Sequence, residues 1–510
     1  MAKSRTKSVS INMIIAFVCQ AVNLLLSFLI RTVFIKTLGT DYLGVNGLFT
    51  NILTILSFAE LGIGNAIVFS MYKPLAQDDT QKVASLMALY KKTYTIIGVI
   101  IASAGLLVTP FLTFIIKDEP NVSESIYLLY VLFLANTVSS YFFVYKKSLI
   151  IADQKNYIVL AITEGVHFVQ TIFQTVFLIL THNFIVYLVF QITFTVLSNF
   201  VASFVANKLY PFLKNKAQKL DKQETKSVFS NVKSLVVYKF GSVILNGTDN
   251  ILLSAMVGIT EVGLASNYVL LTTSCNAILG KITEAFTASV GNLNAYDDKE
   301  RQYNVFNKLL FITVWLYGFA AVGLVAVSPS FISAWLGKDY LLDNVTVIAI
   351  IVGFFVQGAH FAAYTYRTTL GYFKQGRLSP LIAAVLNIVL SIVLCHFIGM
   401  AGIFIATPIS RFLTTGIVDP HFIYKKTFNK KPIIYHLKYF GYLGFVVILG
   451  GLSCYLTSLI SIGGWFGVII NIIIVTAVFN SIMLLVFFRT KMFRELFASF
   501  KNVIKQVVKR

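Results

Sequence analysis

The sequence is dominated by long apolar segments, each followed by a short polar connection. A membrane-spanning helix needs about 20 consecutive, mostly apolar residues. Hydrophobic residues make up 57% of the 510-residue chain and charged residues only 12%, whereas a soluble protein carries about 25% charged residues. Backbone groups in lipid have no water to bond, so segments of this length must be helical. We therefore predict an all-α, polytopic membrane protein.

Fourteen segments are long and apolar enough to span a bilayer. The first follows a basic start, but it is too long for the apolar part of a signal peptide and no small-residue cleavage site follows it. We expect it to be the first span. The approximate ranges are 11–35, 43–71, 93–116, 124–145, 156–181, 184–207, 234–257, 262–290, 305–328, 344–366, 379–397, 401–424, 438–460 and 465–488.

The distribution of Lys and Arg orients these spans. With both termini in the cytoplasm, 35 of the 42 Lys and Arg residues fall in cytoplasmic segments or, for Lys308 and Lys438, at the cytoplasmic ends of spans, whereas three fall in outer loops and four elsewhere within spans. Such an excess is typical of the cytoplasmic loops of membrane proteins. The formal charge of +21 therefore belongs to the inner membrane face, where anionic headgroups attract it. This placement argues against nucleic acid as a partner.

A weak internal repeat divides the chain. Gly39 and Gly44, after the first span, correspond to Gly258 and Gly263, after the seventh, with one offset of 219 residues. We predict two pseudo-repeated six-helix lobes, 1–210 and 234–424, joined by a cytoplasmic linker, 211–233. Transporters built from two parallel halves commonly bind substrate between them. Two extra helices, 425–488, precede a basic amphipathic tail, 489–510, which lies flat on the inner leaflet or packs under the bundle.

Polar side chains form stripes at helical spacing within several spans. Thr50, Thr54, Ser57 and Glu60 follow one another at steps of three or four residues. Because a charge near the bilayer centre costs at least about 3 kcal/mol, such stripes should face a bundle interior or a watery cavity. We predict substrate-binding roles in a cationic, hydroxyl-lined central cavity for residues of these stripes and for one deep arginine: Asn23, Arg31, Glu60, Lys239, Asn246, Asp249 and Arg411.

Four more ionisable residues are candidates for ion coupling or for ion pairs between helices: Glu164, Lys281, Glu284 and Asp419. Those near the cytoplasmic ends, and Lys239 with them, have the alternative of snorkelling to the headgroups. Arginine and lysine suit a phosphate group, whereas amides and hydroxyls suit sugar hydroxyls. A carboxylate among cations takes a coupling proton or cation, or holds an arginine in place.

The sequence carries no catalytic signature. It contains no HExxH, GxSxG or Walker phosphate loop, and its four cysteines lie in apolar runs without disulfide or zinc spacing. The longest outer loop, about 328–344, offers only Lys338, Asp339 and Asp343. We therefore expect no enzyme, no metal and no cofactor. In the absence of an ATP-binding domain, the driving force would be a proton or sodium gradient, the membrane potential or substrate consumption.

The stretch RTVFIKTLGTDYLGVNGLFTNILTILSFAELGIGNAIVFSMYKPLA, residues 31–76, with its LGxxxxG and AELGIGNA motifs, resembles the polysaccharide-flippase (Wzx-like) branch of the multidrug/oligosaccharidyl-lipid/polysaccharide (MOP) exporter superfamily. The likeness is to repeat-unit flippases of Gram-positive bacteria. It implies a two-lobe, alternating-access transporter in the bacterial cytoplasmic membrane. Its substrate would be an undecaprenyl-diphosphate-linked oligosaccharide for capsule, exopolysaccharide or teichoic-type polymers. Membrane lipids and polysaccharide assembly proteins would be its partners, and charged cavity residues would bind diphosphate and sugar.

Two other functions stay open at this point. An ion-coupled exporter of small amphipathic compounds would belong to the same superfamily, whose cation exporters typically have twelve spans. A polytopic glycosyltransferase or polymerase would need an essential acid in an outer loop, for which Asp339 and Asp343 are the candidates.

Overall fold

The computed structural model describes residues 2–60, 63–214, 218, 220–221, 225, 232–294, 298–372, 375–460 and 462–498, and in these ranges it contains helices and no strand. The chain forms two compact units. The first comprises Met1–Ser266 with Pro380–Val385, and the second comprises Asn267–Ser379 with Leu386–Arg510. The division of the chain into lobes at 211–233 stays a prediction.

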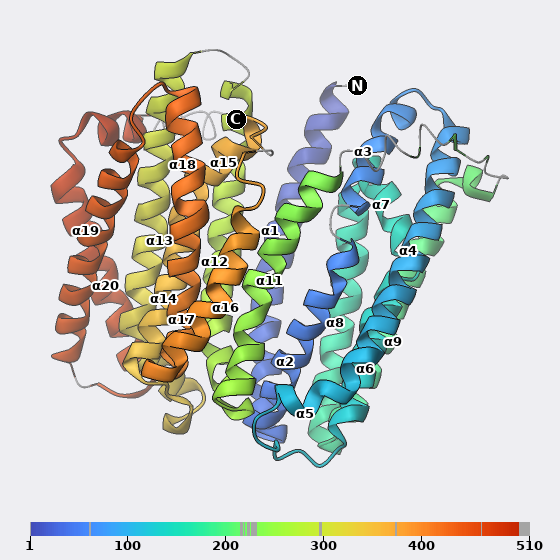
Figure 1. The fold of residues 1–510 in the computed structure, drawn as a ribbon, viewed down its shortest axis with the longest axis horizontal. Coiled ribbons are helices and arrows are strands. Elements are labelled where there is room, and N and C mark those ends of the chain that lie inside the picture. Colours follow the sequence, from blue (N-terminus) through green and yellow to red (C-terminus); the bar gives the residue numbers. More distant parts are fainter. Residues whose placement is uncertain are drawn as a thin grey trace. The chain divides into compact units, whose positions relative to one another are not determined.

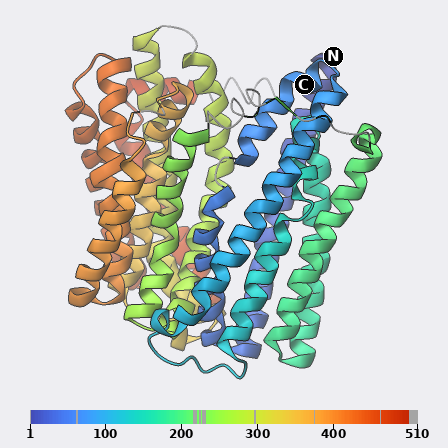
Figure 2. The same cartoon turned by 45° about the vertical axis from the view of Figure 1, so that its right-hand side comes forward.

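The first unit is a helical bundle in which α4, α6, α8 and α9 run alongside one another (Figures 1 and 2). Helix α1 packs on α8, and α11 packs on α2. The bounds are α1 (Ala2–Leu38), α2 (Thr40–Leu56), η1 (Ser57–Glu60), α3 (Ile63–Ala76), α4 (Thr80–Val108), η2 (Thr109–Phe111), α5 (Leu112–Ile115), α6 (Ile126–Tyr141), α7 (Val144–Ala152), α8 (Asn156–Thr181), α9 (Phe184–Leu209), η3 (Pro211–Lys214) and α11 (Val232–Met256).

The second unit is built around α13, which contacts α14, α19 and α20. Its twelfth predicted span contains two π-helical turns, η5 and η6. Helix α12 begins in the first unit. The bounds are α12 (Ile259–Asn294), α13 (Lys299–Trp335), η4 (Lys338–Tyr340), α14 (Asn344–Ala359), α15 (Phe361–Thr369), α16 (Ser379–Ile398), α17 (Met400–Arg411), η5 (Phe412–Gly416), α18 (Ile417–Phe422), η6 (Ile423–Thr427), α19 (Ile433–Ser458) and α20 (Gly464–Phe487).

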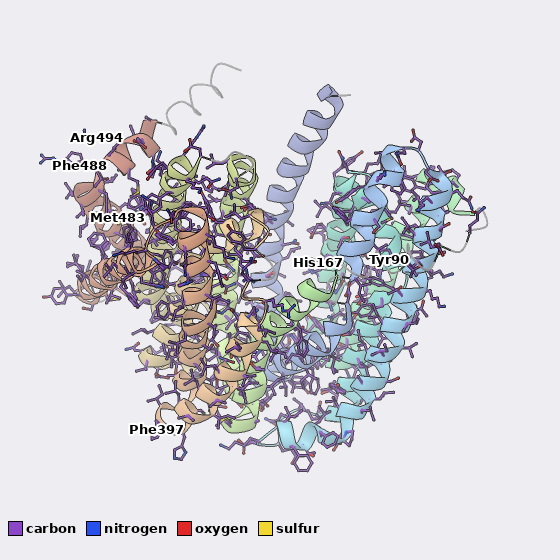
Figure 3. All side chains as sticks on the ribbon, turned by 45° about the horizontal axis from the view of Figure 1, so that its top comes forward. Tyr90, His167, Phe397, Met483, Phe488 and Arg494 are labelled. Atoms are coloured by element: carbon purple, nitrogen blue, oxygen red, sulfur yellow. The ribbon has the colours of Figure 1, made fainter. Side chains whose placement is uncertain are left out.

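The chain is a multi-pass membrane protein. In the described part, eleven helices are long and apolar enough to cross a membrane, or twelve if α6 and α7, bent by 41°, form one span. Large apolar side chains cover the outside of the bundles, such as Phe397 on α16, which is 75% exposed (Figure 3). An exposed apolar surface of this kind matches lipid rather than water.

The predicted number of spans, fourteen, is recovered in part. The two segments outside the eleven or twelve are 43–71 and 234–257. Both are helical in the described residues, but the first is divided among α2, η1 and α3, and the second, α11, carries polar residues such as Asn246 and Asp249 along its length. Because neither segment meets the requirement of length and hydropathy as one helix, a total of fourteen spans stays a prediction.

The first part of the C-terminal tail packs against α13. Residues 491–498 are helical, and Lys308 Nζ lies 2.6 Å from Glu495 Oε2. The rings of Trp315 and Phe493 stack with their centroids 5.9 Å apart. This part of the tail therefore contacts the bundle. Its place relative to the inner leaflet stays a prediction, and residues 499–510 lie outside the described part.

Candidate functional site

An open cavity of about 530 Å³, lined largely by polar side chains, lies in the first unit. Its walls come from seven elements: α1, η1, α4, α6, α7, α8 and α9. Two carboxylates line it, Glu60 and Glu164, together with the ammonium group of Lys147 and the imidazole of His167. Amide and hydroxyl groups complete the polar lining: Asn23, Tyr94, Ser140, Tyr141, Thr163, Gln170, Thr195, Ser198 and Asn199. Polar stripes of several apolar helices thus meet in one chamber.

Two interruptions of the helices border this cavity. The turn η1 separates α2 from α3 and ends at Glu60. The second interruption lies between Tyr141, the last residue of α6, and Val144, the first of α7, where Phe143 has a φ of 65°. A bulky residue rarely adopts this left-handed conformation. At membrane depth, irregular backbone is tolerated only where it is buried in protein or lines a water-filled cavity, so both breaks are consistent with a polar chamber here.

Glu60 is held by a chain of hydroxyl groups. Tyr94 Oη donates to Glu60 Oε1 over 2.6 Å, and Tyr90 Oη donates to Tyr94 Oη over 3.2 Å. Tyr90 Oη in turn lies 3.1 Å from Ser148 Oγ on α7. Gly64 faces both tyrosines, since a Cβ there would lie 2.6 Å from Tyr94 Oη. The chain of hydroxyls therefore fixes the Glu60 carboxylate against α4 and connects it to α7.

Glu164 is held from the first helix. Asn23 Nδ2 donates to Glu164 Oε2 over 2.6 Å and so joins α1 to α8. Asn23 and Glu60 are predicted to bind substrate, and Glu164 is predicted to take part in ion coupling or in an ion pair between helices. The structure brings these three residues into one cavity.

Among the cavity residues that the sequence did not predict are a lysine and a histidine, Lys147 and His167. Lys147 Nζ donates to Ser198 Oγ on α9 over 3.1 Å, although its place after the fourth span assigns it to a cytoplasmic loop. The bend between α6 and α7 turns it inward. His167 had a usable signal, because Glu164, His167 and Gln170 are spaced three residues apart on α8 and therefore share a helix face.

The charge of this cavity is more acidic than the cationic interior predicted from the sequence. Its described lining contains two carboxylates against one ammonium group. The carboxylates of Glu60 and Glu164 accept hydrogen bonds, whereas Lys147 and the amides donate them. Such a lining suits a neutral, hydroxyl-rich group or a cation better than a diphosphate.

Four more of the predicted residues lie outside this cavity. Arg31 Nη1, on α1, donates to Ser266 Oγ on α12 over 2.8 Å. Asn246, on α11, donates to the backbone carbonyl of Ser242 over 2.7 Å. Asp249 is half-buried on the same helix, and Lys281 is exposed on α12. The side chains of Lys239 and Glu284 lie outside the described part of the structure.

The last two predicted residues belong to the second unit. Arg411, at the end of α17, lines a small cavity of about 40 Å³ together with Gln357 and His360. Asp419 is 2% exposed. His360 Nε2 lies 3.1 Å from Asp419 Oδ2, so the same imidazole borders both the small cavity and the buried carboxylate.

The partner of Asp419 is Arg367, which directly follows the predicted span 344–366 and so belongs to a predicted cytoplasmic loop. Arg367 is 3% exposed, and its Nη1 lies 3.0 Å from Asp419 Oδ1. Its Nη2 donates to the carbonyls of Gln375 and Gly376 over 3.3 and 3.4 Å. Within the described residues, Asp419 thus forms a buried ion pair, and Arg367 also holds the loop that follows α15. A position at the end of an apolar segment gave no sign of this burial.

Metal binding finds no support in the part of the chain that the structure describes. No group of three or more His, Cys, Asp or Glu residues is placed there to hold a metal ion.

Comparisons with known proteins identify a sequence family and a shared fold. A family model described as polysaccharide biosynthesis protein matches residues 9–290, more than half of the chain. No curated protein matches the sequence significantly.

Solved structures of two kinds share the fold. The lipid II flippase MurJ, in an inward closed conformation, has 16% sequence identity and a TM-score of 0.63 over 93% of this chain and 100% of that chain. An inward-facing multidrug resistance MATE family transporter of the MOP superfamily has 13% identity and a TM-score of 0.60 over 79% and 95%. The Vibrio cholerae MATE transporter VcmN in the bent form has 11% identity and a TM-score of 0.53 over 81% and 95%.

Proposed function

The chain belongs to the polysaccharide biosynthesis protein family, and we propose that it flips undecaprenyl-diphosphate-linked oligosaccharide repeat units across the bacterial cytoplasmic membrane. It is a membrane transporter of the MOP superfamily and not an enzyme. The units would supply capsule, exopolysaccharide or teichoic-type polymer, and both termini would lie in the cytoplasm. Transport would proceed by alternating access.

The observation that supports this proposal most is the polar cavity of the first unit. Its volume of about 530 Å³ falls within the ~300–1,000 Å³ of ligand pockets. Every sugar hydroxyl both donates and accepts hydrogen bonds, and the lining offers both kinds of partner. Glu60 and Glu164 accept, Lys147 donates, and Gln170 and Asn199 do both. We assign to this cavity the glycan part of the substrate.

The diphosphate needs a different place, because two carboxylates in one chamber repel an anion. Arg31, Lys239 and Arg411 stay the proposed contacts for the diphosphate, since arginine and lysine bind phosphate well. Asn246 and Asp249 also stay proposed substrate-binding residues. Lys281, Glu284 and Asp419 stay candidates for coupling or pairing.

A second candidate function is export of small cationic compounds coupled to a proton or sodium gradient. The excess of carboxylates over ammonium groups in the cavity favours it, since Glu60 or Glu164 would then hold a cation. In this case, deletion would raise drug sensitivity and leave the surface polymer unchanged. Loss of a flippase would instead reduce the surface polymer and leave drug sensitivity unchanged.

Complementation of a deletion strain tests the proposed function. The strain receives the parent gene, the Glu60→Gln variant or the Glu164→Gln variant, and both surface polymer and undecaprenyl-linked repeat units are measured. We expect each variant to reduce surface polymer at least tenfold while lipid-linked repeat units accumulate inside. The control is Asp339→Asn, an exposed acid in an outer loop, which should behave as the parent. Normal polymer with raised drug sensitivity would favour the second function instead.

A further inference from the structure

One segment of the second unit carries a marked excess of positive charge. Residues 425–438, which run from η6 into α19, contain five lysines and no acid: Lys425, Lys426, Lys430, Lys431 and Lys438. No Asp or Glu occurs in the chain between Asp419 and Glu495. Asp419 is buried against Arg367, and Glu495 lies against Lys308. The charge of this segment must therefore be balanced by groups outside it.

Two of these lysines are held on one aromatic ring, that of Tyr303 near the start of α13. The helices α13 and α19 lie side by side (Figure 1). The Nζ atom of Lys430 lies 4.4 Å from the ring centroid, and that of Lys438 lies 5.0 Å from it. Lys438 Nζ also donates to Tyr303 Oη over 3.1 Å and to Asn307 Oδ1 over 2.8 Å. Tyr303 thus fixes two ammonium groups close to one another.

The positive charge of this pair is poorly compensated. Lys430 Nζ lies 2.9 Å from Glu300 Oε1, but the side chain of Glu300 is 70% exposed. An exposed ion pair contributes little, because water and salt screen it. Within the described residues, the hydrogen bonds of Lys438 go to two neutral oxygens. An ammonium group has three donors, so Lys438 can donate to one further acceptor.

An apolar face of α19 lies directly beside these cations. Ile433, Leu437 and Phe440 are four and three residues apart, and each is at least 50% exposed. Residues at this spacing share one face of a helix. The charge distribution places the start of α19 at the cytoplasmic side of the membrane, where exposed apolar side chains of a span face lipid. Fixed cations and a surface for acyl chains therefore meet at the depth of the inner headgroups.

We propose that the start of α19 is a binding site for one anionic phospholipid of the inner leaflet. The phosphate accepts hydrogen bonds from Lys430 and Lys438, and an acyl chain lies along the apolar face of Ile433 and Leu437. Lysine binds phosphate as a point charge, and basic groups on this side of a membrane attract anionic headgroups. Tyr303 holds both cations in place, which distinguishes this site from a diffuse attraction. A prenyl diphosphate has the same phosphate chemistry, but phospholipid is the lipid in excess around an open helix face.

A tryptophan placed on the apolar face reports which lipid occupies it. The three native tryptophans are replaced by phenylalanine, and Leu437→Trp is introduced. The protein is reconstituted into vesicles of phosphatidylcholine and phosphatidylglycerol in which one or the other lipid is brominated, so that quenching gives the local ratio of the two. Phe204→Trp, on α9 of the first unit and about as exposed as Leu437, measures the general enrichment at a cytoplasmic helix end. We expect phosphatidylglycerol to be enriched about fivefold more at position 437 than at position 204.

Removing the two charges should abolish this difference. Lys430→Gln combined with Lys438→Gln keeps a hydrogen-bond donor at each position but removes both charges, so the enrichment at position 437 should fall to that at position 204. Lys430→Arg combined with Lys438→Arg keeps the charges and should retain the enrichment. Glu300→Gln should increase it, because the acid that competes with the phosphate is lost.

The matched control is Lys91→Gln combined with Lys92→Gln, which removes the same charge from two exposed lysines of α4. This pair should leave the enrichment at position 437 unchanged, and an equal loss in the control would overturn the proposal. Equal enrichment at positions 437 and 204 in the parent would do so as well. Displacement of phosphatidylglycerol from position 437 by a stoichiometric amount of undecaprenyl phosphate would assign the site to a prenyl phosphate and also overturn it.

Discussion

The buried pair of Asp419 and Arg367 predicts the largest single-residue effect on stability in the second unit. Asp419 and Arg367 are 2% and 3% exposed, and 3.0 Å separates Nη1 from Oδ1. Removing one member leaves an uncompensated charge in an apolar interior, which costs about 3–5 kcal/mol. We therefore expect Asp419→Asn and Arg367→Met each to lower the free energy of unfolding by about 3–5 kcal/mol.

The double variant should lose much less than the sum of the two. With both charges gone, the desolvation cost of the pair disappears as well, and replacing a whole buried pair is often close to neutral. What remains is the loss of the bonds from Arg367 to the carbonyls of Gln375 and Gly376, which costs about 1–3 kcal/mol. The double variant should therefore have a higher free energy of unfolding than either single variant. The coupling energy between the two sites should be about 3 kcal/mol or more.

Unfolding of the purified protein in mixed micelles, titrated with SDS and followed by tryptophan fluorescence, measures these free energies. The four proteins needed are the parent, Asp419→Asn, Arg367→Met and the double variant. Additive losses, within about 0.5 kcal/mol, are the behaviour of independent sites and would refute a coupled buried pair. Single losses below about 1 kcal/mol would equally show that the two charges are solvated.

Two further predictions concern packing and pH. A Cβ on Gly358 would overlap the ring of Tyr317, whereas one on Gly353 of the same helix would have its nearest neighbour at 3.9 Å. Gly358→Ala should therefore lose about 1–3 kcal/mol of stability, and Gly353→Ala should gain slightly from helix propensity. The same SDS titration measures both. The hydrogen bond from Lys308 lowers the pKa of Glu495 below its ordinary value, so the pair stabilises docking of residues 491–498 at neutral pH, and this contribution is lost as pH falls through the lowered pKa. Limited proteolysis should cut the tail faster below pH 4 than at pH 7, and Glu495→Gln should remove most of that difference; an unchanged pH effect in Glu495→Gln would disprove the assignment.

The sequence predicts the spans well because their cause is local. A run of about 20 apolar residues crosses a bilayer whatever its neighbours are, and twelve of the fourteen predicted ranges coincide with helices, or a bent pair of helices, that meet this requirement. Helical spacing also states which face of a span a residue occupies. That is why Asn23 and Glu60 could be singled out before any contact was known. Glu164 was identified instead because it is an ionisable residue within a span.

The breaks and the partners could not be predicted in the same way, because they depend on contacts between segments far apart in the chain. Lys147 follows an apolar run and reads as a loop residue, yet the bend after Tyr141 carries it into the cavity. Arg367 also ends an apolar run, and its burial depends on Asp419, 52 residues later. Helical spacing predicts on which face of its own helix a residue lies. It does not predict which other helix packs against that face.

The repeat lies between these two cases. Equal spacing identifies Gly44 and Gly263 as equivalent positions, and this needs only the sequence. That each glycine faces the backbone carbonyl at the start of the other's helix follows only from the three-dimensional structure. The equivalence of Gly44 and Gly263 was therefore predictable from the sequence, whereas the contact between their helices was not.

The central claim is that the polar cavity of the first unit holds the glycan of a lipid-linked substrate during transport. The most direct measurement is flipping of a fluorescent undecaprenyl-diphosphate-linked oligosaccharide by purified protein in proteoliposomes, with Glu60→Gln combined with Glu164→Gln, and Asp339→Asn as the control. We predict that the double variant, correctly folded by SDS titration, flips at least tenfold more slowly than the parent and that Asp339→Asn flips at the parental rate. A folded double variant that flips at the parental rate would contradict the claim.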